Sequence, residues 1–346
     1  MSRRIPCKTN YWFNGAVLAI ITGLVGCASD SPTADTTTTV SKPEVVASST
    51  ILCDLTEQIA QDTIDLTCLM EPEQDPHTYT ITPGDRKAIE TATLILYSGY
   101  GLVPPVEKAV AQTDTTIPKI AVYEQAVPNP ILAGHHHHEE HGHHDEHDHH
   151  DHEKEETATE TEELTPDPHV WHDAQNGVAI VEVIESQLAQ INPEQASLYS
   201  QNATALKEEL EKLDTWVKKQ VQTIPEGQKT LVTTHDAFNY YIQAYGLENS
   251  EALQGFSTEE KPTASRVKEL VAKVKETKVP TIFAEISTND RVIGTVANEA
   301  GVKVSESKLL AGALGAQGSE TGTYVGFITY NTCAIVNGLG GKCTSF

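Results

Sequence analysis

Apolar residues recur along the chain with two spacings, and their alternation predicts a mixed α/β fold. Residues 44–55 form an apolar run typical of a buried strand that leads into a helix, and residues 63–70 form a second strand. Residues 86–99 then have the pattern of a helix followed by a third strand. Strands that alternate with helices in this way favour parallel βαβ units.

A different spacing dominates the middle of the chain. Apolar residues recur at helical intervals over residues 173–191, where they include Val178, Val181, Ile184 and Leu188. A second helix is expected over residues 194–222, roughly 45 Å long at 1.5 Å per residue. Its predicted buried stripe comprises Leu198, Ala205, Leu206, Leu210, Leu213 and Val217. The strand and helix pattern resumes over residues 229–307, so we predict two doubly wound α/β lobes joined by one long, rigid helix.

The pattern also predicts the domain boundaries. These are a signal peptide (1–26), a flexible tether (27–43), an N-terminal lobe (44–191) with an insertion (134–163), a linking helix (192–223) and a C-terminal lobe (224–346).

The N-terminus has the features of an export signal. Arg3, Arg4 and Lys8 precede an apolar run at residues 15–26, which is too short to span a bilayer. Its last residues and the next one, Leu24-Val25-Gly26-Cys27, resemble a bacterial lipoprotein box, which implies cleavage before Cys27 and acylation of its thiol. An ordinary signal peptide followed by a chance cysteine is the alternative.

Export places the mature chain in an oxidising compartment, where cysteines form disulfides. Beyond the lipobox, four cysteines remain, and they allow three connectivities. The local pairing is the most economical if the two ends of the chain lie in separate domains: Cys53–Cys68 with Cys333–Cys343. A zinc site made of all four thiolates is the rival interpretation, although the chain has no CxxC motif.

The formal net charge of −25 argues against a nucleic-acid partner. Eleven of the fifteen histidines lie in one acidic tract, which is part of the insertion at residues 134–163. The tract lacks apolar periodicity and is expected to be a disordered loop. Such a tract binds zinc, copper or nickel weakly and in many geometries, so we expect an accessory role; a merely solubilising loop is the alternative. Its histidines are His135, His136, His137, His138, His141, His143, His144, His147, His149, His150 and His152.

The four histidines outside the tract lie where predicted elements meet loops. His77 and His235 follow strands of opposite lobes, and His169 and His172 precede a helix. Ligands of doubly wound lobes bind beyond the carboxyl ends of the strands, and neutral imidazole is a common ligand for zinc. Any one of these residues alone is explained by a hydrogen-bonding role, but three separate loops could bring imidazoles to one cleft between the lobes.

Four motifs give the chain a specific resemblance. DPHTYTITPGD (75–85), DPHVWHD (167–173), THDAFNYYIQAYGL (234–247) and IFAEISTND (282–290) follow one another in the order found in periplasmic metal receptors of bacterial ABC transporters. Together with the long helix and the histidine-rich insertion, the similarity covers residues 45–341. It implies a periplasmic or membrane-anchored lipoprotein that delivers zinc or manganese to a membrane permease, and we expect a monomer.

The resemblance makes His77, His169 and His235 the metal ligands. Zinc receptors of this group carry His at the third position, whereas manganese receptors usually carry Glu, so His235 favours zinc. One tight Zn²⁺ is therefore expected, with further weakly bound ions in the tract.

Three further positions refine this site. Gly312 stands where many relatives have an Asp ligand, which leaves three histidines plus water or a mobile side chain. Glu285 matches a family carboxylate near the site and is expected to orient an imidazole N–H. His172 has no usual counterpart in the family and is expected to lie on the surface.

Two other functions compete with a zinc receptor, besides a manganese receptor of the same family. Three histidines and an open position also describe catalytic zinc sites, but the chain lacks HExxH and GxSxG motifs, and we predict that it is not an enzyme. A storage or adhesion lipoprotein, in which the tract is the whole function, is the other alternative.

Overall fold

The computed structural model describes residues 41–114, 116–134 and 164–346. The predicted signal peptide, Cys27, most of the tether and all eleven histidines of the tract lie outside the described residues. The described chain from Lys42 to Phe346 forms one compact unit, and none of its helices is both long and apolar enough to cross a membrane.

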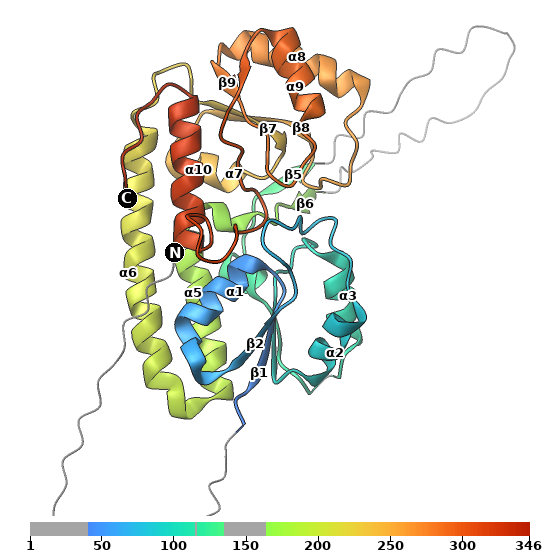
Figure 1. Cartoon of the computed structure of the whole chain (residues 1–346), viewed down its shortest axis with the longest axis vertical. Coiled ribbons are helices and arrows are strands. Elements are labelled where there is room, and N and C mark those ends of the chain that lie inside the picture. Colours follow the sequence, from blue (N-terminus) through green and yellow to red (C-terminus); the bar gives the residue numbers. More distant parts are fainter. Residues whose placement is uncertain (1–40, 115, 135–163) are drawn as a thin grey trace, which may run out of the picture. The chain divides into compact units, whose positions relative to one another are not determined.

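The first sheet is parallel throughout and has the strand order β2-β1-β3-β4. Its strands are β1 (Glu44–Ala47), β2 (Asp65–Cys68), β3 (Leu94–Tyr97) and β4 (Lys119–Ala121). Figure 1 shows helix α1 on one side of this sheet and helices α2 and α3 on the other. These helices, with the short α4 that follows β4, are α1 (Thr50–Ala60), α2 (Pro83–Thr91), α3 (Pro104–Gln112) and α4 (Val122–Ala126).

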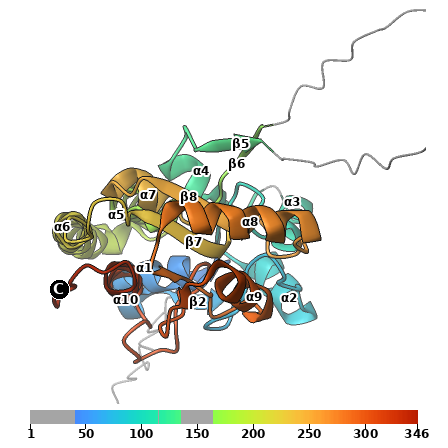
Figure 2. The ribbon, with the colours of Figure 1, turned by 90° about the horizontal axis from the view of Figure 1, so that it is seen from above.

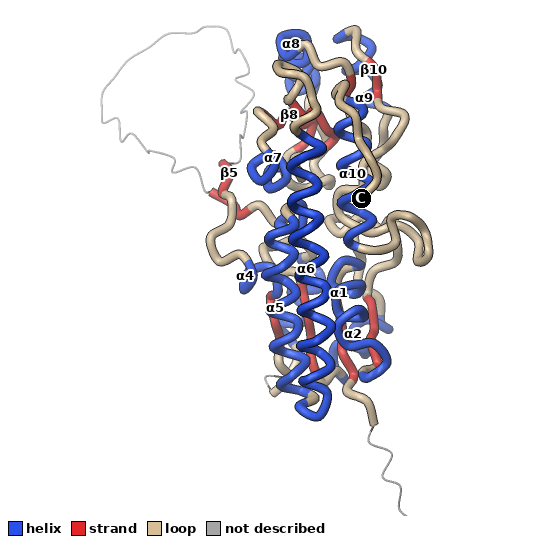
Figure 3. Tube along the Cα trace, turned by 90° about the vertical axis from the view of Figure 1, so that its left-hand side faces the viewer, coloured by secondary structure: helices blue, strands red, loops and turns tan. Residues whose placement is uncertain are grey.

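Two long helices follow the first sheet and lie side by side (Figures 1 and 3). They are α5 (Ala174–Ile191) and α6 (Ala196–Val221), separated by the 3₁₀ turn Pro193–Gln195. The long helix is therefore a few residues shorter than predicted. Its buried stripe also differs, because Tyr199 and Ala203 are buried whereas Ala205 is exposed and Leu198 is only half-buried.

The second half of the chain repeats the strand and helix alternation with shorter strands. β7 (Thr230–His235) pairs in parallel with β8 (Asn249–Gln254), and β9 (Thr281–Ile282) with β10 (Lys303–Val304). The Phe283 N–H donates to the Val232 carbonyl at 2.8 Å and connects the two pairs. Figure 2 shows the helices of this half, α7 (Asn239–Tyr245), α8 (Ala264–Thr277), α9 (Arg291–Ala300) and α10 (Tyr324–Gly338).

This arrangement confirms the predicted α/β class. The lobe boundaries stay a prediction, since residues 42–346 form one unit. Strand β8 and helix α10 were not expected from the sequence, and α10 packs against α6 (Figure 3).

Two disulfides and one antiparallel strand pair link further segments of the described chain. Disulfides join Cys53 to Cys68 and Cys333 to Cys343, with Cα–Cα distances of 5.8 and 5.1 Å. Strands β5 (Leu132–Gly134) and β6 (Leu164–Pro166) pair antiparallel. They flank residues 135–163, so the two ends of the insertion lie next to each other.

Candidate metal centre

Three histidines meet in the described structure, each presented by a different segment. His77 lies in the loop between β2 and α2, His169 immediately precedes the 3₁₀ turn Val170–His172, and His235 is the last residue of β7. Their ring centroids are 5.2 to 5.5 Å apart, and all three are buried. One potential ligand atom from each lies within 4.8 Å of the other two.

The distances suit a single metal ion. The Nε2 atoms of His77 and His169 are 3.2 Å apart, close to the ~3.3 Å that separates two nitrogens bound at about 2.05 Å to a tetrahedral zinc. The Nε2 atom of His235 is buried and has no hydrogen-bond partner among the described residues. A buried nitrogen without a partner has a free-energy cost, which coordination of a cation removes.

Burial keeps two of the rings neutral. Burial, reinforced by the neighbouring imidazoles, lowers the pKa of His77 to about 2. The pKa of His169 is lowered well below its ordinary value for the same reasons. At neutral pH both rings therefore present unprotonated nitrogens, as a metal ligand must.

His235 behaves differently because it contacts a carboxylate. Burial opposes its charged form, but the Glu285 carboxylate against its Nδ1 outweighs burial and raises the pKa of His235. The other oxygen of Glu285 accepts the backbone N–H groups of Thr234 and His235 at 3.1 and 3.0 Å. Glu285 thus lies where it was expected, beside an imidazole N–H, and it directs Nε2 of His235 toward the other two rings.

A second carboxylate holds His169 in the same way. Asp167 Oδ1 accepts both the backbone N–H of His169 at 2.9 Å and its ring Nδ1–H at 2.8 Å. Asn239 donates to Oδ2 at 3.1 Å. Asp167 was not singled out from the sequence, although the DPH motif that it shares with Asp75 was a signal for it.

The same signature gives a different contact at the first ligand. Asp75 Oδ1 accepts the backbone N–H of His77 at 3.0 Å, but its Oδ2 accepts the Thr258 hydroxyl at 2.5 Å instead of a ring nitrogen. Nearby, the ring of Phe256 lies 6.3 Å from that of His169. The loop after β8 therefore contacts the segments of two ligands.

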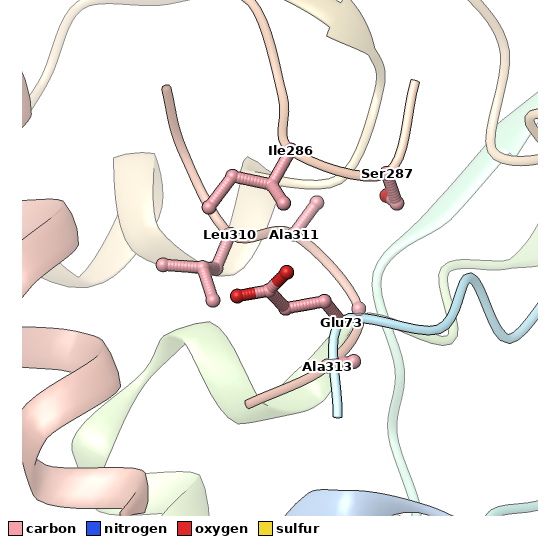
Figure 4. A pocket seen from close by; sticks show the side chains of 7 residues that line it. Glu73, Ile286, Ser287, Leu310, Ala311 and Ala313 are labelled. Carbon is pink, nitrogen blue, oxygen red and sulfur yellow. The ribbon is translucent and has the colours of Figure 1, made fainter. Parts of the chain in front are cut away.

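The turn around Gly312 lies close to the segment of His77, and a glycine at this position has no side chain that could bind a metal. A Cβ atom on Gly312 would lie 2.6 Å from Cδ of Pro76, the residue before His77. Beside this turn is a cavity of about 10 Å³, at the lower limit for one water molecule. Figure 4 shows the Glu73 carboxylate directed into that space, near Leu310 and Ala311.

The expectation that His172 lies on the surface is wrong. Its side chain is fully buried between the rings of Phe238 and Phe327, with centroid distances of 4.3 and 5.5 Å. Its Nε2 donates to the Ala311 carbonyl at 3.0 Å, so it does not face the three converging rings. Both phenylalanines are distant in sequence, which is why the local pattern did not indicate burial.

Comparison with known proteins identifies relatives along nearly the whole described chain. The ZnuA family, described as the periplasmic component A of a zinc-uptake complex, matches residues 45–338. The manganese-binding lipoprotein MntA of Bacillus subtilis is 31% identical over 331 residues, covering 94% of this chain and 97% of that protein. The zinc-binding protein TroA of Treponema pallidum is 31% identical over 302 residues, covering 86% and 89%. A solved structure of TroA superposes with a TM-score of 0.74 at 30% identity, covering 86% of this chain and 99% of that one.

Proposed function

This chain belongs to the ZnuA family of periplasmic metal-binding components of ABC transporters, and we propose that it is the member that captures zinc and delivers it to a membrane permease. Zinc is its cargo, held as one tight ion by His77, His169 and His235. In this proposal the chain carries out no chemistry on a substrate.

The composition of the ligand set carries the proposal. All three converging side chains are imidazoles, which suit zinc, whereas carboxylate oxygens suit manganese. The carboxylates of Asp167 and Glu285 contact Nδ1 atoms, on the far side of the rings from the converging nitrogens. Pro76 lies against Gly312, so a side chain there would require local movement.

Manganese is the second candidate cargo, because MntA of Bacillus subtilis and PsaA of Streptococcus pneumoniae are both named for manganese. The donor set argues against it, since a three-imidazole site lacks the oxygen ligands that a harder ion prefers. In a competition titration the zinc receptor should retain zinc when manganese is in large excess. Displacement by an equal amount of manganese would favour the second candidate.

Three histidines and an open position could also form the site of a zinc enzyme. Against it stand the family's role in transport and the lack of recognised hydrolase motifs in the sequence. Hydrolysis of an activated ester that is lost in His77→Ala would support the enzyme. We expect no turnover above the protein-free rate.

The histidine tract and the lipid anchor complete the proposal. We propose that Cys27 carries the anchor and that residues 134–163 are an accessory capture segment. The pairing of β5 with β6 fixes the base of this segment, so its deletion need not disturb the fold. A protein that lacks His135 to His152 should keep one tight zinc and lose only weaker sites.

The deciding experiment is a chelator-competition titration of the tract-deleted protein with zinc. Replacing His235 by Ala should weaken the tight site by at least about 100-fold, because one of three ligands is lost. Gln201→Ala, on the exposed face of α6, is the control and should match the unmodified protein. An unchanged affinity in His235→Ala would refute the assignment.

A further inference from the structure

One short segment contacts residues that hold or adjoin each of the three histidines. We call residues 309–314 the brace. Leu309 forms an isolated parallel bridge with Glu285, in which the Ile286 N–H donates to the Leu309 carbonyl and the Leu309 N–H donates to the Ala284 carbonyl, both at 2.9 Å. At its far end, Leu314 accepts the Glu73 N–H at 2.8 Å and donates to Thr50 Oγ1 at 2.9 Å.

The middle of the brace links the other two ligand segments. The Ala311 carbonyl accepts two side-chain hydrogen bonds, from Trp171 Nε1 and His172 Nε2, each at 3.0 Å. These donors follow His169 by two and three residues. The next residue, Gly312, lies against Pro76, which precedes His77.

His172 adds a third connection, to the segment of His235. Its ring packs at 4.3 Å on Phe238, three residues beyond His235. One buried imidazole therefore contacts the brace and the His235 segment while its own backbone continues from His169.

If residue 172 served only to fill space, an imidazole would be less favourable there than an apolar ring. His172 is fully buried, and its Nδ1 has no hydrogen-bond partner among the described residues. A buried polar atom without a partner has a free-energy cost. Phenylalanine would fill similar space without that cost, and Ala311 would keep the hydrogen bond from Trp171.

We propose that His172 is a positioning residue for the metal centre: it binds no metal, and its Nε2–H bond to Ala311 keeps the brace in register with the His169 and His235 segments. The inference rests on the proposed site of His77, His169 and His235. The spacing of the three converging nitrogens then depends on a side chain outside the ligand set. Loss of the bond should loosen the site for a small tetrahedral ion without unfolding the protein.

The test compares variants that differ in the donor at this position, all in the tract-deleted protein. His172→Gln retains an N–H donor, His172→Met has similar length without one, and His172→Phe keeps an aromatic ring without one. Zinc affinity is measured by chelator competition, the geometry of the site by the visible spectrum of the cobalt(II) form, and apo stability by thermal unfolding.

We expect His172→Phe and His172→Met to bind zinc about 10-fold more weakly, with a changed cobalt spectrum, as for other residues that support metal ligands. The apo His172→Phe protein should be at least as stable as the unmodified protein. His172→Gln should restore most of the affinity.

Two results would overturn the proposal: a folded His172→Phe with unmodified affinity and spectrum, or a His172→Gln as weak as His172→Met. If His172→Phe does not fold, the Gln and Met pair decides. Failure of the unmodified protein to bind zinc or cobalt would instead refute the proposed function itself, so the two failures are distinguishable.

Discussion

Replacing Glu285 by Gln should weaken zinc binding through a change of tautomer at His235. In the present structure Oε1 of Glu285 accepts two backbone N–H groups, and Oε2 contacts Nδ1 of His235. A glutamine must keep its oxygen toward the two N–H groups, so its NH₂ group faces Nδ1. Nδ1 then becomes an acceptor, and the ring proton moves to Nε2, the atom that zinc needs.

The magnitude follows from this conflict. Zinc can bind Nε2 of His235 in the variant only if the ring proton returns to Nδ1 or leaves the ring. A proton on Nδ1 places two donors against each other, the Nδ1–H and the glutamine NH₂ group, or one hydrogen bond of the glutamine breaks. Loss of one buried hydrogen bond costs about 1–3 kcal/mol, or roughly a 5- to 150-fold loss of affinity at 1.36 kcal/mol per tenfold. Chelator competition at pH 7.5 measures this loss directly.

Asp167→Asn is the matched control, because it also removes one buried carboxylate next to a ligand. Asp167 accepts both the N–H and the Nδ1–H of His169 on a single oxygen. An asparagine keeps that acceptor, and its NH₂ group faces Asn239, whose own amide can rotate to accept. We expect a smaller loss than in Glu285→Gln. Equal losses of zinc affinity in the two variants would show that the charge of the carboxylate matters and the tautomer does not. An unchanged zinc affinity in Glu285→Gln would show that Glu285 does not control the tautomer of His235.

Three further predictions concern selectivity, pH and covalent structure. His235→Glu should weaken zinc and relatively improve manganese, because carboxylate oxygen is the harder ligand; an unchanged ratio in competition titrations would show that His235 does not set selectivity. Burial raises the pKa of Asp54 from 3.8 to about 6, against hydrogen bonds from the Tyr324 N–H and Gln58. The folded state thus holds this proton more tightly than the unfolded state, so stability falls as pH rises from about 4 to 6. At pH 7.5, Asp54→Asn should therefore raise the free energy of unfolding by about 1–2 kcal/mol, which thermal unfolding detects as a higher midpoint temperature. At pH 4 the substitution should give no gain. An equal gain at both pH values would exclude titration of Asp54 as the cause. Alkylation of the exported protein without reductant should label none of the four paired cysteines, and labelling of Cys53 together with Cys68 would argue against that bridge.

The sequence was sufficient to predict the α/β class because its buried strands are short apolar runs separated by amphipathic helices. It was insufficient where burial depends on distant residues. Helix α10 has apolar residues on most of its faces, so no stripe marks it, and β8 (NSEALQ) has too few apolar residues to resemble a strand. On α6, buried Tyr199 and exposed Ala205 reverse the expected pattern because α1, α5 and α10 pack around that helix.

The site shows the same division. His77, His169 and His235 could be singled out because they follow or precede predicted elements and lie in the motifs that carry the resemblance. The burial of His172 depends on Phe238, Phe327 and Ala311, none of which adjoins it in the sequence. Local patterns and motifs thus predict the candidate ligands and the carboxylate of Glu285, whereas the burial of His172 comes from tertiary packing.

The metal content of the untagged protein, purified from the periplasm of its source bacterium, decides between zinc and manganese as the cargo. A tract-deleted form is measured alongside. We predict close to one zinc per tract-deleted protein, no stoichiometric manganese, and loss of that zinc in His235→Ala. One manganese per protein would show that zinc is not the cargo, and loss of the tight zinc on removal of the tract alone would show that the three histidines are not the receptor site.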